Sequence, residues 1–110
     1  MEKIKVAYID YTTYGTLMVL QLRENGIGIV GADSLDDFLS RHNLKEFPVL
    51  LIHPGRGNQP LVPKIVKDFP HIKIALTTSP TSEGDYFGSD IPAFGYSSIR
   101  AIEEFIRENQ

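Results

Sequence analysis

The sequence contains no cysteine, few clustered basic residues and no long apolar run. Without cysteine there is no disulfide framework and no thiolate metal site, which fits a reducing compartment. Lys and Arg number 11 against 14 Asp and Glu, for a formal net charge of −3. Because non-specific nucleic-acid binding needs clustered Lys and Arg, we expect no nucleic-acid partner. The chain also lacks a span of about 20 apolar residues and a signal-peptide core, so we expect a cytoplasmic protein with no membrane partner.

The length and composition predict one globular domain. A chain of 110 residues is long enough to bury a single core, and two domains would leave neither viable. Its 42% hydrophobic and 23% charged residues are ordinary globular values. We therefore expect residues 1–110 to fold alone as a single domain.

Strand-like and helix-like segments alternate along the chain. β-rich apolar runs predict strands at residues 4–9, 27–32, 47–52, 72–76 and 91–94. Apolar spacing of three and four residues predicts helices at about 14–24, 35–42, 61–69 and from 99 onward. The apolar residues Leu35, Phe38 and Leu39 share one predicted face, and Leu61, Val62, Ile65, Val66 and Phe69 share another. Ser34 and either Ser97 or Ser98 are the expected N-caps of two helices, and Asn25-Gly26 is the expected end of the first.

This order of elements predicts an α/β fold. Right-handed crossovers between parallel strands place helices on both faces of a doubly wound sheet, in three layers. The run at 47–52 shows no polar alternation, which is typical of a central strand covered on both faces. Residues 79–90 stand where a fourth crossover helix belongs, but they have no apolar period, two glycines and a proline. We predict an irregular loop there, or at most one helical turn.

The layout resembles the receiver domain of bacterial response regulators over nearly the whole chain. Three features carry the resemblance: Asp10 ends the first strand, a buried third strand ends in a Pro-Gly turn, and a threonine ends the fourth. The resemblance implies a flavodoxin-like, five-stranded parallel sheet in the order 2-1-3-4-5. It also implies the chemistry of that family. There, an aspartate at the tip of the third strand accepts a phosphoryl group, beside an acidic pair that holds magnesium.

The match to that chemistry is incomplete. Asp10 corresponds to one acid of the pair, and its neighbours Ile9 and Tyr11 are not carboxylates. The acceptor position falls on His53 if the strands are aligned by length, or on Leu50 if the Pro-Gly turns are superposed. Neither residue is an aspartate.

The sensing groups are also only partly present. Thr77 or Thr78 corresponds to the hydroxyl that senses the phosphate in the family, but the fifth strand at residues 91–96 has no lysine. We therefore predict a degenerate receiver, a pseudo-receiver related to two-component systems that does not accept a phosphoryl group. We expect no enzymatic activity, no resident metal and no cofactor.

Polar side chains at the carboxyl ends of the strands form the candidate site for a small ligand, because doubly wound folds bind ligands at this edge. If a small ligand binds, its expected contacts are Asp10, Thr12, Thr13, His53, Arg56, Thr77 and Thr78. The alternative function is therefore binding of a nucleotide, a flavin or a phosphorylated metabolite. Residues 10–16 are loosely similar to the FMN phosphate loop of flavodoxins, and a helix N-terminus favours anions. No nucleophile elbow supports a Ser–His hydrolase.

Two interpretations of His53 remain. In the first, His53 has a chemical role, as a phosphoryl acceptor, a metal ligand or a general base oriented by Asp10. Alternatively, it caps a strand and forms a hydrogen bond with Asp10 or with a backbone carbonyl. The structural role is favoured, because His42 and His71 make no recognisable metal-ligand spacing with His53.

Four aromatic residues on or beside the 79–90 segment suggest an interaction surface: Tyr86, Phe87, Phe94 and Tyr96. Such rings either mark a partner surface or fold onto their own core. In receivers, the corresponding face binds signalling partners and dimer mates. We predict a non-phosphorylatable protein-interaction or signalling module that binds a protein partner, or forms a homodimer, through the fifth strand and the last helix.

Overall fold

The computed structural model describes residues 5–10, 13–54, 61–78, 84–85, 91–95 and 98–110. Strands alternate with helices, as predicted. The strands are β1 (Lys5–Ile9), β2 (Gly28–Ala32), β3 (Val49–Ile52), β4 (Lys73–Thr78), β5 (Gly84–Asp85) and β6 (Pro92–Gly95). The helices are α1 (Thr13–Glu24), α2 (Leu35–Arg41), the 3-10 turn η1 (Leu44–Glu46), α3 (Leu61–Asp68) and α4 (Ile99–Glu108).

The strands form one sheet in the order β2-β1-β3-β4-β6-β5. The first five of these pair in parallel, which confirms the predicted order 2-1-3-4-5, with β6 as the predicted fifth strand. β3 lies at the centre, and all four of its residues are buried. The apolar run at 47–52 therefore marks the central strand, as expected.

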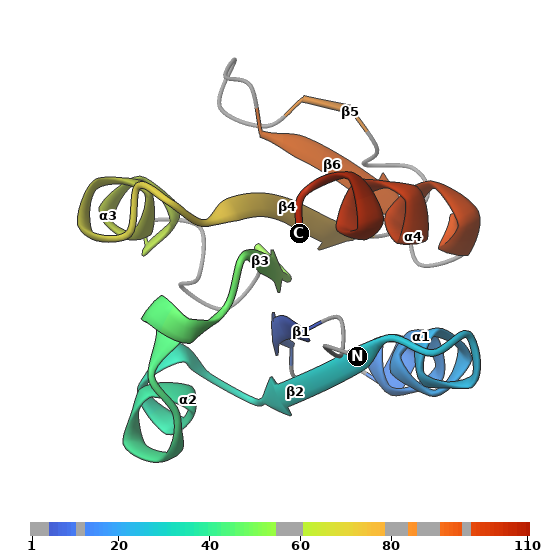
Figure 1. The fold of residues 1–110 in the computed structure, drawn as a ribbon, viewed down its shortest axis with the longest axis horizontal. Helices are drawn as coiled ribbons and strands as arrows, with labels where there is room; N and C mark the ends of the chain where they lie inside the picture. The colour runs from blue at the N-terminus through green and yellow to red at the C-terminus, as the bar shows by residue number, and fades with distance from the viewer. Residues whose placement is uncertain (1–4, 11–12, 55–60, 79–83, 86–90, 96–97) are drawn as a thin grey trace.

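Helices cover both faces of the sheet (Figure 1). α1 and α4 lie on one face, while α2 and α3 lie on the other. Successive strand residues point to opposite faces, so each strand contributes to two separate cores. In β1, for example, Val6 and Tyr8 join the core under α1 and α4, whereas Ala7 and Ile9 join the core under α2 and α3.

The helix ends agree with the predicted stop and start signals in part. Gly26 adopts a positive φ of 89°, and the Ile27 amide donates to the Leu22 carbonyl at 3.1 Å, so the glycine ends α1 in a Schellman-type turn. The Ser34 side chain accepts from the Asp37 amide and caps α2 as predicted. Ser98 occupies the N-cap of α4, which is one of the two predicted positions, but its side chain makes no capping hydrogen bond.

Two of the predicted apolar helix faces are only partly buried. Leu39 is 43% exposed although it was placed on the same face as Phe38, which is completely buried. Val66 on α3 is 45% exposed beside the buried Ile65. Adjacent helix positions are 100° apart, so when Phe38 or Ile65 points into the core, the following residue falls at the margin of the apolar stripe.

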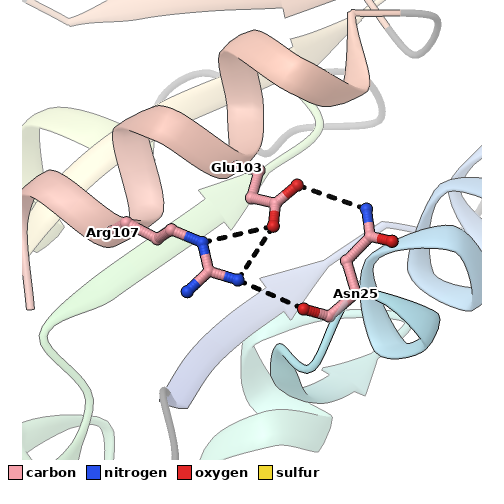
Figure 2. A network of polar contacts seen from close by, with 3 residues as sticks. All are labelled: Asn25, Glu103 and Arg107. Atoms are coloured by element: carbon pink, nitrogen blue, oxygen red, sulfur yellow. Dashed lines mark hydrogen bonds and ion pairs between the residues drawn. The ribbon is translucent and has the colours of Figure 1, made fainter.

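A hydrogen-bonded cluster ties α4 to the turn that follows α1 (Figure 2). Arg107 donates through Nε and a terminal nitrogen to Glu103 Oε1, at 3.2 and 2.9 Å, and also to the Asn25 carbonyl at 3.1 Å. The side-chain Nδ2 of Asn25 donates to Glu103 Oε2 at 3.2 Å. Because Asn25 precedes β2, this cluster lies near the amino ends of the parallel strands, away from the candidate ligand edge.

The segment between β4 and β6 differs from the prediction at the two residues that are described. Gly84 and Asp85 form β5, which pairs antiparallel with β6 and was not predicted. The remainder of the predicted irregular loop, residues 79–83 and 86–90, lies outside the described residues. In the described part of the chain, no helix combines the length and apolar character that a membrane crossing requires.

Candidate functional site

Three of the predicted ligand residues meet at the carboxyl edge of the sheet. Ile9 pairs with Ile52, and Ile52 pairs with Leu76. The residues that follow, Asp10, His53 and Thr77, therefore stand side by side across three neighbouring strands. Strand alternation directs their side chains toward the face under α1 and α4, because Tyr8, Leu51 and Ala75, two residues earlier, belong to that core.

The register decides which residue occupies the tip of the third strand. Leu50 lies inside β3 and is completely buried, with its side chain in the core under α2 and α3. The His53 amide continues the ladder beyond β3 by donating to the Ile9 carbonyl at 2.9 Å. His53, and not Leu50, therefore stands at the strand tip beside Asp10.

His53 is held by a backbone carbonyl. Its Nδ1 lies 2.9 Å from the Thr77 carbonyl oxygen. A carbonyl oxygen only accepts, so Nδ1 must carry the proton, and Nε2 is the basic nitrogen of the neutral ring. This is one of the two hydrogen bonds that the structural interpretation of His53 considered. It fixes the plane of the half-buried ring across the ends of β3 and β4.

Asp10 is a buried carboxylate that accepts from a tyrosine. The side chain of Asp10 is 7% exposed, and the Tyr8 hydroxyl donates to its Oδ2 at 2.5 Å. The two residues lie two positions apart on β1 and so share a face of the sheet. Sequence reasoning did not select Tyr8 as a site residue, although its spacing from Asp10 was the available signal.

Gly15 allows the first turn of α1 to approach this pair. A Cβ atom added at Gly15 would come within 2.7 Å of Asp10 Oδ2 and 2.9 Å of Asp10 Cγ, and would also clash with the Tyr8 hydroxyl. Real Cβ atoms do not approach other heavy atoms this closely. Gly15 belongs to residues 10–16, which are loosely similar to a phosphate loop, but in the structure it lies against the Asp10 carboxylate and the Tyr8 hydroxyl.

Thr77 contributes a buried hydroxyl with no hydrogen bond. The side chain is completely inaccessible, and its Oγ1 has no hydrogen-bond partner among the described residues. An unsatisfied buried hydroxyl costs about 1–3 kcal/mol. The backbone of Thr77 is nevertheless engaged, since its carbonyl accepts from His53.

For the other predicted ligand residues, the structure describes the backbone at most. Thr13 begins α1, and Thr78 ends β4, where it pairs with Gly95. Thr12 and Arg56 lie outside the described residues. Among the side chains that the structure describes, the convergence at the strand tips therefore consists of Asp10, His53 and Thr77.

A hollow of about 190 Å³ opens beside Asp10, between α1, β1 and β2. It is lined by Tyr8, Asp10, Gly15, Thr16, Val19, Gly31, Ala32 and Asp33. Asp10 belongs to both the strand-tip group and this hollow. Sequence reasoning missed Gly31 and Asp33, although both stand at the carboxyl end of the second strand, where ligands are expected.

The residues at the strand tips do not fit the magnesium site that the receiver resemblance implies. Mg²⁺ prefers an octahedral shell of oxygen ligands. A second carboxylate would be needed at Ile9 or Tyr11, and neither residue is one. The Ile9 side chain is buried under α2 and α3, Tyr11 lies outside the described residues, and the tip of β3 offers an imidazole. In the described part of the chain, no three His, Cys, Asp or Glu side chains are grouped to hold a metal ion.

The predicted interaction surface is described only at Phe94. The Phe94 ring is half-buried and lies 5.8 Å from the ring of Phe105 on α4, tilted by 60°. Both rings pack against the core under α1 and α4. The Phe94 ring therefore packs against the core of its own domain. Tyr86, Phe87 and Tyr96 lie outside the described residues, so the interaction surface stays a prediction.

The fold is that of a receiver-like α/β domain. No family model and no curated protein matches the sequence. Among solved structures, the chain is similar to a response regulator receiver domain protein from Bacillus halodurans, with a TM-score of 0.72, 16% identity, and coverage of 96% of this chain and 97% of that one. It is also similar to a response regulator from Thermotoga maritima, with a TM-score of 0.70, 16% identity and 97% of each chain covered. At this identity, the similarity establishes the receiver fold.

Proposed function

We propose that this chain is a receiver-like signalling module that acts by binding a protein partner and does not accept a phosphoryl group. The observation that carries the proposal is the identity of the residue at the tip of β3. His53 stands there, with Nδ1 held on the Thr77 carbonyl, where a receiver has its acceptor aspartate. The proposed module is not an enzyme and needs no cofactor.

The charges around His53 support this proposal. Transfer of a phosphoryl group builds up negative charge that metal ions and cationic side chains normally stabilise. Asp10 is the one carboxylate at the tip of β1, and its charge already attracts the Tyr8 hydroxyl. The fifth strand, β6, has the sequence PAFG and supplies no ammonium group. A phosphoryl group at this edge would therefore meet the Asp10 carboxylate, and the described carboxyl ends of β1, β3 and β6 carry no Lys or Arg side chain.

Intact-mass measurement tests the proposal directly. The protein is incubated with acetyl phosphate or phosphoramidate in the presence of Mg²⁺, beside a receiver domain that retains its acceptor aspartate. We expect the control to gain the mass of one phosphoryl group and this chain to gain none. An adduct on this chain would refute the proposal, and its loss in a His53→Asn variant would identify the imidazole as the acceptor.

The proposed partner face comprises β6 and α4. The aromatic pair Phe94 and Phe105 leaves part of its surface exposed there, and half-buried aromatic rings are common at protein interfaces. Sedimentation velocity over a range of concentrations tests the homodimer form of this proposal. A dimer that dissociates when Phe105→Ala is introduced would support it, whereas a dimer unaffected by that change would place the contact elsewhere.

The alternative function is the binding of a small molecule, for which the hollow beside Asp10 is the described cavity. A thermal-shift screen against nucleotides, flavins and sugar phosphates separates the two, because binding to the native state must raise the midpoint. Two carboxylates, Asp10 and Asp33, line the hollow. They would repel a phosphate group, so we expect no shift with these anionic ligands.

A further inference from the structure

We propose that the hollow between α1 and β2 receives an arginine side chain from a protein partner. This inference extends the proposed function, since it assumes that the chain is a protein-interaction module. The hollow measures about 190 Å³. About 10–15 Å³ is enough for one water molecule, so the space accommodates a group of side-chain size.

The negative charge of the hollow favours the binding of a cationic group. Asp10 and Asp33 contribute carboxylates, and none of the lining residues that the structure describes is basic. Asp33 is exposed, and no hydrogen bond or ion pair joins it to another residue of the described structure. An acidic concavity raises the local concentration of cationic groups and steers their approach.

The walls of the hollow favour a guanidinium group on an alkyl stem. Val19 and Ala32 are half-buried and provide apolar contact for methylene groups. Gly15 and Gly31 have no side chains, which keeps the space open. A guanidinium is more weakly hydrated than an ammonium and forms paired hydrogen bonds with carboxylates. For a metal ion, by contrast, the described residues offer no group of three His, Cys, Asp or Glu side chains.

An exposed apolar face beside the hollow indicates that the cation belongs to a protein. Leu17 and Leu20 on α1 are 62% and 52% exposed, although the core side of α1 is already filled by Met18 and Leu22. Leu20 lies one helical turn from Thr16, which lines the hollow, so the two are neighbours on the helix surface. A partner that supplies apolar side chains next to its arginine would cover both features at once.

NMR titration with matched probes tests the cation site. Amide resonances of the ¹⁵N-labelled protein are followed while N-acetyl-arginine methylamide or its uncharged citrulline counterpart is added. We expect saturable shifts at Thr16, Gly31, Ala32 and Asp33 with the arginine probe. Because citrulline has nearly the same shape without the charge, we expect it to bind more weakly by on the order of tenfold. Equal binding of the two probes, or no saturable shift with arginine, would overturn the proposal.

Two charge variants locate the binding. Asp33→Asn should lower the affinity for the arginine probe by about twofold to fivefold, which is the range for an exposed ion pair. Asp36→Asn removes the same charge outside the hollow and should leave the affinity within about twofold. If both variants weaken binding equally, the effect is general electrostatics and the proposal fails. It also fails if MgCl₂ shifts the same resonances and displaces the arginine probe.

Binding of two matched peptides tests whether the arginine belongs to a protein partner. The probes are a short peptide with one arginine flanked by leucines and a peptide in which serines replace the leucines. We expect tighter binding of the leucine peptide, and a Leu20→Ser variant should remove the difference. Equal affinity for the two peptides would refute a role for the α1 face. None of these results depends on the phosphodonor experiment, so the two proposals fail separately.

Discussion

Replacing Gly15 by alanine tests how closely α1 approaches the Tyr8–Asp10 pair. In a helix interior, alanine is favoured over glycine by about 1 kcal/mol, so an unobstructed position would be stabilised. Here the new Cβ would overlap the Asp10 carboxyl and the Tyr8 hydroxyl, both of which are buried. Overpacking costs about 1–3 kcal/mol, and displacing a hydrogen bond to a charged group costs about 1.5–3 kcal/mol more. We expect a net loss of about 2–4 kcal/mol in the free energy of unfolding.

Urea denaturation followed by far-ultraviolet circular dichroism measures this loss. Gly31→Ala serves as the matched control, because its Cβ would meet only the Tyr8 carbonyl oxygen at 3.7 Å, an ordinary contact. That variant should keep or slightly raise the stability of the protein. At about 4 °C per kcal/mol for a domain of this size, Gly15→Ala should also lower the melting temperature by roughly 8–16 °C.

The Tyr8→Phe background identifies the clashing atom. With the hydroxyl absent, the cost of Gly15→Ala should fall by at least about 1 kcal/mol, which a double-mutant cycle reports as coupling. If Gly15→Ala is neutral or stabilising in the parent protein, α1 does not approach β1 as described. If the two changes are simply additive, the Tyr8 hydroxyl is not the obstacle.

Three further substitutions test individual contacts by urea denaturation. Thr77→Val removes a buried hydroxyl without a partner and should stabilise the protein by up to about 1 kcal/mol; a loss of that size would mean that the hydroxyl is hydrogen-bonded. His53→Leu leaves the Thr77 carbonyl without its donor and should cost about 1–2 kcal/mol, whereas His53→Asn retains a donor and should cost less than half as much. Equal losses would contradict the Nδ1 hydrogen bond. Arg107→Ala should lower the free energy of unfolding by about 0.5–1.5 kcal/mol, and by less in 1 M salt. Arg100 is exposed on the same helix, and Arg100→Ala should change the free energy of unfolding by no more than about 0.5 kcal/mol. Equal effects of the two arginine variants would argue against the cluster with Glu103.

Much of the fold could be predicted because its signals are local. The apolar run of β3 marked the central strand, and the stripe of Ile99, Ile102, Phe105 and Ile106 marked α4. β5 had no such signal. Its two residues are Gly84 and Asp85, and they form a strand because β6 lies beside them. Pairing imposed by a neighbour leaves no periodic pattern in so short a segment.

The candidate site could likewise be predicted only where its signals are local. The meeting of Asp10, His53 and Thr77 could be predicted, because parallel strands end at one edge of the sheet. The Tyr8–Asp10 hydrogen bond and the hollow beside it could not. They depend on how close α1 comes to β1, which Gly15 permits, and spacing along the chain does not contain that distance.

The composition of β6 and its short antiparallel neighbour restricts how another molecule can join this end of the sheet. Pro92 has no amide hydrogen, and the backbone of Pro92 and Ala93 is already paired with β5. An extended peptide seeking to lengthen the sheet at this point would find its ladder positions taken or missing. Recognition at these two positions of β6 must therefore rely on side chains.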